Sequence, residues 1–142
     1  MNTTSNDSRL SEVQRYDPQT DSWEAKASLQ KPREASSLTS LGNKLFACGG
    51  FDGNAMTSCE QYDPDQDAWS FVAPMNRGKS FFCMVSAGGK LYAAGGWNAV
   101  EHHMLNSNET QFTVETYDPA MNRWTQEKIL QENRVDHSCI LL

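Results

Sequence analysis

The sequence predicts an all-β fold built from repeated four-stranded antiparallel units. Two observations lead to this prediction: a Tyr-Asp-Pro triplet followed by a tryptophan occurs three times, and an apolar stretch ending in two glycines occurs twice. Self-similarity of this kind is the signature of a repeat architecture. The tyrosine and tryptophan of each copy, always seven positions apart, are Tyr16 and Trp23, Tyr62 and Trp69, and Tyr117 and Trp124.

Each Tyr-Asp-Pro triplet predicts the turn of a β-hairpin. The residues before it alternate with the period of two that is expected of a strand. Asp-Pro ends that strand, because proline cannot donate to a ladder and the aspartate can accept a hydrogen bond from the turn. The aspartates are Asp17, Asp63 and Asp118. The tryptophan then begins the return strand, where its large ring covers apolar surface.

Two more strands precede each complete hairpin. Residues 44–50 match residues 90–96 without a gap, and each stretch follows an apolar segment and a two-residue, glycine-containing turn. Such a turn between apolar segments indicates a hairpin. The paired glycines, which predict a close approach by another backbone or ring, are Gly49, Gly50, Gly95 and Gly96. One unit therefore contains four strands.

This arrangement resembles the kelch repeat, whose marks are the double glycine and the later, spaced tyrosine and tryptophan. The resemblance covers the chain from about residue 11 to its end, and the tryptophans recur after 46 and then 55 positions. It implies kelch-type β-propeller blades, each a four-stranded antiparallel meander. We expect the three tryptophans of the repeats to be buried between blades, near the Gly-Gly backbone.

The chain divides unevenly into blades. We expect residues 1–10 to form a disordered tail and residues 11–142 to form the kelch-repeat region. The expected parts are a partial blade at 11–29, complete blades at 35–75 and 81–130, and the first strand of another at 135–142. Closed propellers usually have four to eight blades. We therefore predict an incomplete propeller: a fragment of a larger one, a truncated product, or a chain that completes its ring with a partner. Its open blade edges favour self-association.

Composition excludes several classes of function. A formal net charge of −6 argues against nucleic acid, whose binding depends on clustered Lys and Arg. No apolar run approaches the roughly 20 residues of a membrane span, and the polar first ten residues do not resemble a signal peptide. The four cysteines, none in a C-x-x-C pair, are expected to be reduced and buried, which favours a cytoplasmic or nuclear location. They are Cys48, Cys59, Cys83 and Cys139.

The loops at one rim of the blades are the candidate binding site. In a four-stranded meander, the loop after the second strand and the connection to the next blade emerge on the same face. Resemblance to kelch proteins of the substrate-adaptor kind assigns partner binding to that face, where arginine forks suit carboxylates and phosphates. Simple solvated loop residues are the alternative. The candidates are Arg33, Arg77, Lys79, Trp97, His102 and Arg134. The loop at 97–112 is nine residues longer than its counterpart and is expected to be mobile.

We expect no catalysis, metal or cofactor. The chain contains no nucleophile, phosphate-loop or H-E-x-x-H signature, and His102 and His103 are adjacent without a third ligand at a defined spacing. Copper-radical oxidases also use kelch-type propellers, but the tyrosines here occupy repeat positions, which favours a structural role. The sequence therefore predicts a non-catalytic protein-interaction module. It resembles the substrate receptor of a kelch-like adaptor for a cullin-type ubiquitin ligase; the alternative is an actin-binding or cytoskeletal kelch module.

Overall fold

The computed structural model describes residues 10–98, 113–131 and 136–140, which form ten strands. Among them there is no helix with the length and apolar character that a membrane span requires. The strands are β1 (Val13–Asp17), β2 (Ser22–Lys26), β3 (Ser37–Leu41), β4 (Lys44–Cys48), β5 (Cys59–Asp63), β6 (Ala68–Val72), β7 (Cys83–Ala87), β8 (Lys90–Ala94), β9 (Thr113–Asp118) and β10 (Arg123–Ile129).

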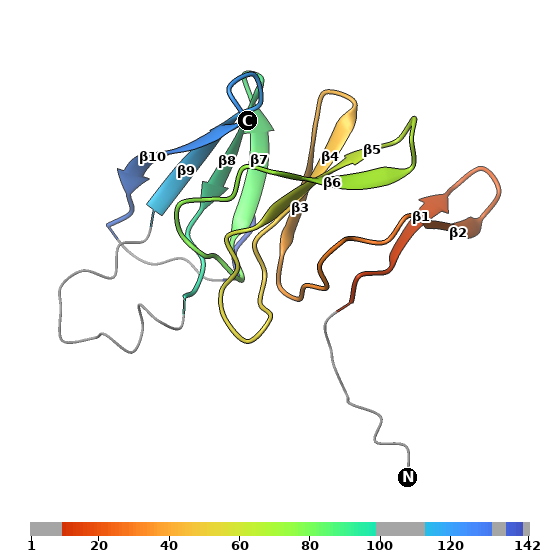
Figure 1. Cartoon of the computed structure of the whole chain (residues 1–142), viewed down its shortest axis with the longest axis horizontal. Helices are drawn as coiled ribbons and strands as arrows, with labels where there is room; N and C mark the ends of the chain where they lie inside the picture. The colour runs from red at the N-terminus through yellow and green to blue at the C-terminus, as the bar shows by residue number, and fades with distance from the viewer. Residues whose placement is uncertain (1–9, 99–112, 132–135, 141–142) are drawn as a thin grey trace, which may run out of the picture.

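The strands form two four-stranded antiparallel sheets and one two-stranded sheet (Figure 1). Strands β3 to β6 pair in chain order, and β7 to β10 do the same, so each large sheet is a meander. Strands β1 and β2 pair only with each other and carry the first Tyr-Asp-Pro triplet. The predicted all-β fold of four-stranded antiparallel blades is therefore confirmed.

Aspartate side chains shape the outer turns. Oδ1 of Asp17, Asp63 and Asp118 accepts a hydrogen bond from the backbone N–H two residues later, at 2.9, 3.0 and 3.0 Å. The carboxylate thereby satisfies a backbone donor that proline's fixed geometry exposes in the turn. In each hairpin the tryptophan is the second residue of the return strand and lies opposite its tyrosine in the ladder. The hairpin that each Tyr-Asp-Pro triplet predicts is therefore present in all three copies.

The main hydrophobic core lies between the two complete blades. It combines Phe46 and Met75 from the first blade and its exit with Phe82, Leu91 and Trp124 of the second. Each of these side chains is at least 94% buried. Burial of a large apolar side chain stabilises a fold by roughly 1.5–3 kcal/mol. Each blade therefore depends on its neighbour for stability, as expected of a repeat architecture.

The paired glycines allow the backbones of neighbouring blades to approach. Gly49 has a φ of +62°, and a Cβ there would lie 2.6 Å from Cε1 of Phe82. Gly50 has a φ of +104°, and its Cβ would lie 2.7 Å from the carbonyl oxygen of Glu34. Such separations are too short for any side chain. The ring beside Gly49 is a phenylalanine of the next blade, so the expectation that the repeat tryptophans lie near Gly-Gly is wrong.

The three repeat tryptophans differ in burial. Trp69 and Trp124 are 7% and 4% exposed, whereas Trp23 is 67% exposed. The prediction of a buried tryptophan is therefore wrong for Trp23. The reason is structural: the ring is buried by the blade that precedes its own, and in the described chain β1 and β2 have no preceding blade.

The cysteines also differ from the sequence-based prediction. The structure joins Cys48 to Cys59 and Cys83 to Cys139 as disulfides, with Cα–Cα separations of 4.1 and 5.7 Å. The prediction of four reduced thiols is wrong for this structure. Cys48 and Cys59 face each other across the β4–β5 ladder, so strand register brings the first pair together.

Both ends of the described chain contact a residue that lies shortly before the first strand of a complete blade. Leu10 forms an isolated bridge with Arg33, while residues 1–9 of the expected tail lie outside the described residues. At the other end, residues 136–140 do not form the strand expected at 135–142. The backbone N–H of Asp136 donates to the carbonyl of Phe81 at 2.8 Å.

Candidate functional site

The predicted rim lies along the lower edge of the blades in Figure 1, where the β4–β5 loop and the blade-to-blade connections emerge. Two of its six candidate residues turn inward. Arg33 and Lys79, predicted to contact a partner, are 5% and 4% exposed. The structure therefore corrects their assignment: they are internal cations that hold each blade together.

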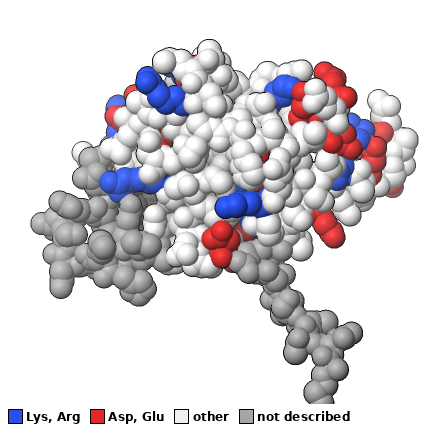
Figure 2. All heavy atoms as spheres, in the orientation of Figure 1, with Lys and Arg blue, Asp and Glu red and all other residues white. Residues whose placement is uncertain are grey.

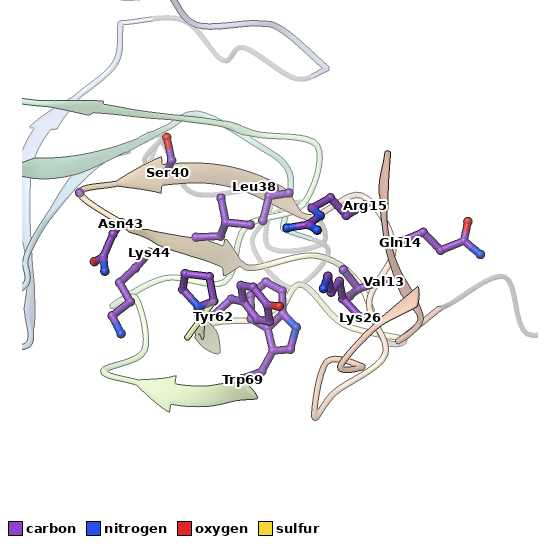
Figure 3. Close-up of a pocket in the computed structure, with 13 residues that line it drawn as sticks. Val13, Gln14, Arg15, Lys26, Leu38, Ser40, Asn43, Lys44, Tyr62 and Trp69 are labelled. Carbon is purple, nitrogen blue, oxygen red and sulfur yellow. The ribbon is translucent and has the colours of Figure 1, made fainter. Parts of the chain in front are cut away.

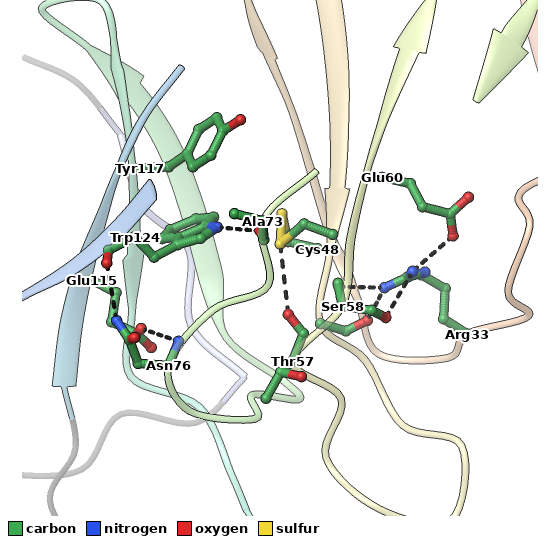
Figure 4. The surroundings of a disulfide bond; sticks show 12 residues. Arg33, Cys48, Thr57, Ser58, Glu60, Ala73, Asn76, Glu115, Tyr117 and Trp124 are labelled. Carbon is green, nitrogen blue, oxygen red and sulfur yellow. Dashed lines mark hydrogen bonds and ion pairs between the residues drawn. A yellow bond between two sulfur atoms is a disulfide. The ribbon is translucent and has the colours of Figure 1, made fainter. Parts of the chain in front are cut away.

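Arg33 ties the Gly-Gly turn to the third strand of its blade (Figure 4). Its guanidinium donates to the carbonyl oxygens of Gly49 at 2.6 Å and Ser58 at 3.0 Å, and to Oε1 of Glu60 at 2.8 Å. The side chains of Arg33 and Glu60 are both fully buried. Glu60 also accepts a hydrogen bond from the backbone N–H of Gln30 at 2.7 Å. The arginine fork is well suited to serve several oxygens at once.

Lys79 occupies the equivalent position in the next blade. Its ammonium group donates to Oγ1 and the carbonyl of Thr113 at 2.8 and 3.1 Å, and to the carbonyl of Gly95 at 3.4 Å. It lies 3.7 Å from the buried carboxylate of Glu115. That carboxylate accepts a hydrogen bond from the backbone N–H of Asn76, as Glu60 does from Gln30. The same hydrogen-bond network therefore recurs, with a lysine ammonium group in place of the arginine guanidinium.

The remaining described candidates form a half-buried part of the rim. Trp97 stacks obliquely on Phe51, with 6.0 Å between ring centroids, and each ring follows the Gly-Gly pair of its own blade. Trp97 also exchanges backbone hydrogen bonds with Ser80, at 2.7 and 3.1 Å. Arg77 is half-buried and already engaged. Asn98 donates from its side chain to the carbonyl of Gly78 at 3.1 Å. These contacts make the rim an aromatic surface joined across two blades.

Two candidates and most of the long loop lie outside the described residues. They are His102, Arg134 and residues 99–112. The face shown in Figure 2 carries isolated patches of Lys and Arg beside Asp and Glu, with no continuous area of one sign. This face therefore has no large basic area that would attract an acidic partner from a distance.

A second recurrent arrangement joins each blade to the one before it. Oδ1 of Asp67 accepts from the backbone N–H of Ala27 at 3.0 Å, and Nε1 of Trp69 donates to the carbonyl of the same Ala27 at 2.9 Å. The hydroxyl of Tyr62 also donates to Asp67, at 2.6 Å. The carboxylate and the indole thus bind both backbone polar groups of a single alanine, and the tyrosine hydroxyl binds the carboxylate. We call this arrangement the clamp of the blade.

The next clamp uses an amide in place of the carboxylate. Oδ1 of Asn122 accepts from the backbone N–H of Ala73 at 2.9 Å. Nε1 of Trp124 donates to the carbonyl of Ala73 at 2.9 Å (Figure 4). Tyr117 donates to Asn122 at 2.8 Å. Asp67 and Asn122 both have a positive φ, of 45° and 46°. Short polar residues tolerate this conformation better than other side chains.

The carboxylate clamp shifts the pKa of its own members. The backbone N–H of Ala27, together with the hydroxyl of Tyr62, holds the pKa of Asp67 below its usual range. The hydrogen bond to Asp67 raises the pKa of Tyr62 to about 12. These shifts follow from stabilisation of the carboxylate by donors and of the phenol by its acceptor. Both shifts therefore result from hydrogen bonds within the clamp, which joins this blade to the preceding one.

A hollow of about 390 Å³ lies between β1–β2 and the first complete blade (Figure 3). Its wall includes Leu38, Leu45 and the ring of Tyr62. The cations around it are already paired: Arg15 and Lys26 both contact Glu24 at 2.8 Å, and Lys44 contacts Asp63. The hollow lies beside the edge of β1 that has no strand partner in the described chain. It is therefore an apolar inter-blade space with little unpaired charge.

The repeated strands, glycines and clamps can be compared with known proteins. A model described as the kelch motif matches residues 32–76 and 78–131, which is more than half of the chain. The chain belongs to the kelch family. The matched residues span both complete blades with their preceding connections, including the internal cations Arg33 and Lys79.

Curated kelch relatives match part of the chain. Human (Homo sapiens) Kelch-like protein 5 is 55% identical over 49 residues, 34% of this chain and 6% of the relative. Human (Homo sapiens) Kelch-like protein 4 is 52% identical over 48 residues, 33% of this chain and 7% of the relative. The matched stretches thus span a small fraction of these relatives. The solved structure of YjhT covers 87% of this chain and 52% of its own, with a TM-score of 0.68 and 15% identity, which supports the fold.

The described kelch blades bring together one set of possible metal donors, Cys83, His137 and Cys139, whose ligand atoms lie within 4.8 Å of one another. This set differs from the His102–His103 pair considered in the sequence. The disulfide between the two cysteines removes both thiolates as ligands, because metals bind the deprotonated thiol. The imidazole is the one ligand of this set that remains.

The kelch network also contains residues that sequence reasoning missed. Glu60 and Glu115 are fully buried and anchor the internal cations. Their signal was present, since each glutamate stands two positions before the tyrosine of a Tyr-Asp-Pro triplet. Phe51 was missed as a rim residue, although it follows Gly-Gly as Trp97 does. The position within the repeat could therefore have identified both the two glutamates and Phe51.

Proposed function

We propose that this chain is a non-catalytic protein-interaction module that binds a protein partner through the rim. The observation that carries the proposal is its identity of 55% and 52% to Kelch-like proteins over single-blade lengths. By analogy with kelch-like substrate adaptors, the partner is a substrate of a cullin-type ubiquitin ligase.

The rim supports this proposal through its chemistry. Phe51 and Trp97 offer two half-buried aromatic faces beside each other, and aromatic side chains are enriched in the cores of protein interfaces. The internal cations Arg33 and Lys79 hold the loops from which these rings project. We therefore assign partner contact to the aromatic pair and a positioning role to the cations. Actin or another cytoskeletal protein is the second candidate partner from the family resemblance.

Site-specific photo-crosslinking tests the proposal. A photoreactive phenylalanine replaces Phe51 at the rim or, as the matched control, Gln66 in the exposed β5–β6 turn at the other end of the blade. We expect specific protein adducts from position 51 and none of the same adducts from position 66. An adaptor role predicts that the captured proteins accumulate when cullin ligases are inhibited in cells.

Two results would contradict this account. Equal capture of the same proteins from both positions would exclude the rim as the binding surface. Co-sedimentation of the chain with filamentous actin, abolished by Phe51→Ala and unchanged by Gln66→Ala, would assign the rim to the cytoskeletal partner instead of a ligase substrate.

A further inference from the structure

A cluster of two cysteines and one histidine joins the second complete blade to the segment that follows it. Cys83 is the first residue of β7, while His137 and Cys139 lie in residues 136–140. The two sulfurs and a ring nitrogen of the histidine all lie within 4.8 Å of one another. Cys83 is buried, whereas His137 and Cys139 are half-buried. The cluster is therefore compact and within reach of small molecules in solution.

The repeat sets the position of this segment. The backbone N–H of Asp136 donates to the carbonyl of Phe81 at 2.8 Å, just as the N–H of Phe81 donates to the carbonyl of Ala35 at 3.0 Å. These three residues have similar positive φ values, of 54°, 52° and 51°. The backbone thus enters beside β7 along the same path by which β7 follows the preceding blade. The placement of His137 and Cys139 next to Cys83 is a consequence of that path.

The metal-binding side chains themselves are not a feature of the repeat. Counted from the residue with positive φ, the complete blades have hydroxyl or apolar side chains at the positions of the histidine and of the second cysteine. These are Ser36 and Phe82 for the histidine, and Leu38 and Met84 for the cysteine. The packing of a blade therefore does not require a sulfur or an imidazole at these places.

The imidazole of His137 contains a nitrogen that lacks a partner. Its Nδ1 is buried and forms no hydrogen bond among the described residues. Buried polar atoms of this kind are rare in folded proteins, and an ion bound beside the atom is one arrangement that satisfies it. A neutral imidazole can bind a metal through either ring nitrogen. A metal ion held through Nδ1 would therefore supply the missing partner.

We propose that Cys83, His137 and Cys139 form a Zn²⁺ site when the disulfide between the two cysteines is reduced. Two thiolates and one imidazole suit Zn²⁺ in a tetrahedral arrangement, with Zn–S and Zn–N distances of about 2.3 and 2.0 Å. Ca²⁺ and Mg²⁺ require oxygen ligands, which this set does not provide. Three protein ligands leave the fourth position to water or to a group of another molecule. The site contains no residue of the rim and does not depend on the proposed function.

The disulfide and the metal site are alternative states of the same two sulfurs. A dithiol reductant transfers two electrons to the S–S bond, which breaks to give two protein thiols while the reductant becomes a cyclic disulfide. Zn²⁺ then displaces the two thiol protons, because the thiolate is the form that binds metal. In the reverse direction, hydrogen peroxide takes two electrons from the thiolates and two protons from solvent and becomes water. The S–S bond forms again, and Zn²⁺ is released.

The other disulfide provides an internal reference. Cys48 and Cys59 are both 0% exposed, and in the described part of the chain they belong to no group of three metal donors. Thiol–disulfide exchange requires access to a sulfur atom. A dithiol should therefore reduce the bond to the half-buried Cys139 before it reduces the bond between Cys48 and Cys59.

Cobalt binding tests the proposal, because Co²⁺ accepts the same ligands as Zn²⁺ and has a visible spectrum. The complete 142-residue chain is reduced with dithiothreitol, separated from the reagent under nitrogen and titrated with Co²⁺. We expect one equivalent to bind, with the intense visible bands of a tetrahedral site and a thiolate-to-cobalt charge-transfer band. Zn²⁺ should displace the cobalt and abolish both signals. The oxidised chain should show neither signal.

Substitutions distinguish this site from other donors in the chain. Cys139→Ser should abolish the tetrahedral spectrum. His137→Ala should weaken binding at least about a hundredfold, because loss of a group that only supports a ligand already costs about 10–100-fold. The matched control replaces the other two histidines of the chain, His102 and His103, by alanine and should bind cobalt as the unchanged chain does. Circular dichroism checks that each variant keeps its β-structure.

A second measurement links the metal to the folded state. Zn²⁺ should raise the thermal unfolding midpoint of the reduced chain, because a ligand of the folded state stabilises it, and a chelator should reverse the increase. Three results would overturn the proposal. They are no tetrahedral cobalt spectrum in the reduced chain, an unchanged spectrum in Cys139→Ser or His137→Ala, and an unfolding midpoint that Zn²⁺ does not change.

Discussion

The first and second Tyr-Asp-Pro hairpins have almost the same local geometry and opposite environments. In both, the tyrosine hydroxyl contacts the aspartate and the two rings lie about 5 Å apart. Yet Trp69 is 7% exposed and Trp23 is 67% exposed. The hairpin geometry is therefore set by local sequence, whereas burial is set by the blade that precedes it. The difference separates what the clamp contributes to its own hairpin from what it contributes between blades.

The largest expected effect is the loss of an occupied clamp. Trp69→Ala removes the indole that holds Ala27 and leaves a cavity, so the free energy of unfolding should fall by about 3–5 kcal/mol. Trp23→Ala should change it by less than about 1 kcal/mol, because the ring is mostly in solvent. Urea unfolding followed by circular dichroism compares the two variants. Equal destabilisation would show that the clamp stabilises only its own hairpin.

The second effect concerns the internal cations. Arg33→Lys copies the chemistry of Lys79 into the first complete blade and removes the fork that serves Gly49, Ser58 and Glu60. We expect a loss of about 1–3 kcal/mol, because buried hydrogen-bond acceptors remain unsatisfied. The matched control is Arg15→Lys, at an exposed ion pair with Glu24, which should cost less than about 1 kcal/mol. Similar unfolding midpoints for both variants would contradict the assigned role of Arg33.

The sequence predicted what depends on local spacing. The strands and the Asp-Pro turns follow from residues close together in the chain. The burial of Arg33 and Lys79 could not be predicted in this way, because both lie in connections between blades while their partners Glu60 and Glu115 lie on the third strand of the blade. A loop arginine and a buried one have the same local sequence signal, and only the fold distinguishes them.

Contacts between blades were the least predictable part. Small glycines indicated a close approach, but the ring that fills the space beside Gly49 belongs to Phe82 of the next blade. The disulfide partners of Cys48 and Cys83 depend on register and on the path of residues 136–140. Composition and motif spacing carry no information about these arrangements. The exposure of Trp23 was missed for the same reason, since its environment depends on a preceding blade.

A smaller effect distinguishes the carboxylate clamp from the amide clamp. The folded-state pKa of Asp67 is depressed by its donors, so the carboxylate contributes stability above the unfolded-state pKa of about 4, and this is lost as pH falls through the folded-state value. Asn122 does not titrate in this range. Asp67→Asn should therefore reduce the loss of stability as the pH falls below about 4. Urea unfolding midpoints of both proteins, measured at a series of acidic pH values, test this. The same dependence of the midpoint on pH in Asp67→Asn and in the unchanged chain would contradict the assigned role of Asp67.

The central claim is that the repeat tryptophans of the complete blades bind the blade before them, while Trp23 has no such partner among the residues that the structure describes. Hydrogen exchange of the three indole N–H groups tests it without any mutation, because a donor buried in a hydrogen bond exchanges only when the structure opens. The account predicts strong protection at Trp69 and Trp124, which donate to Ala27 and Ala73 at 2.9 Å, and rapid exchange at Trp23. Equal protection at all three indoles, or rapid exchange at Trp69, would contradict it.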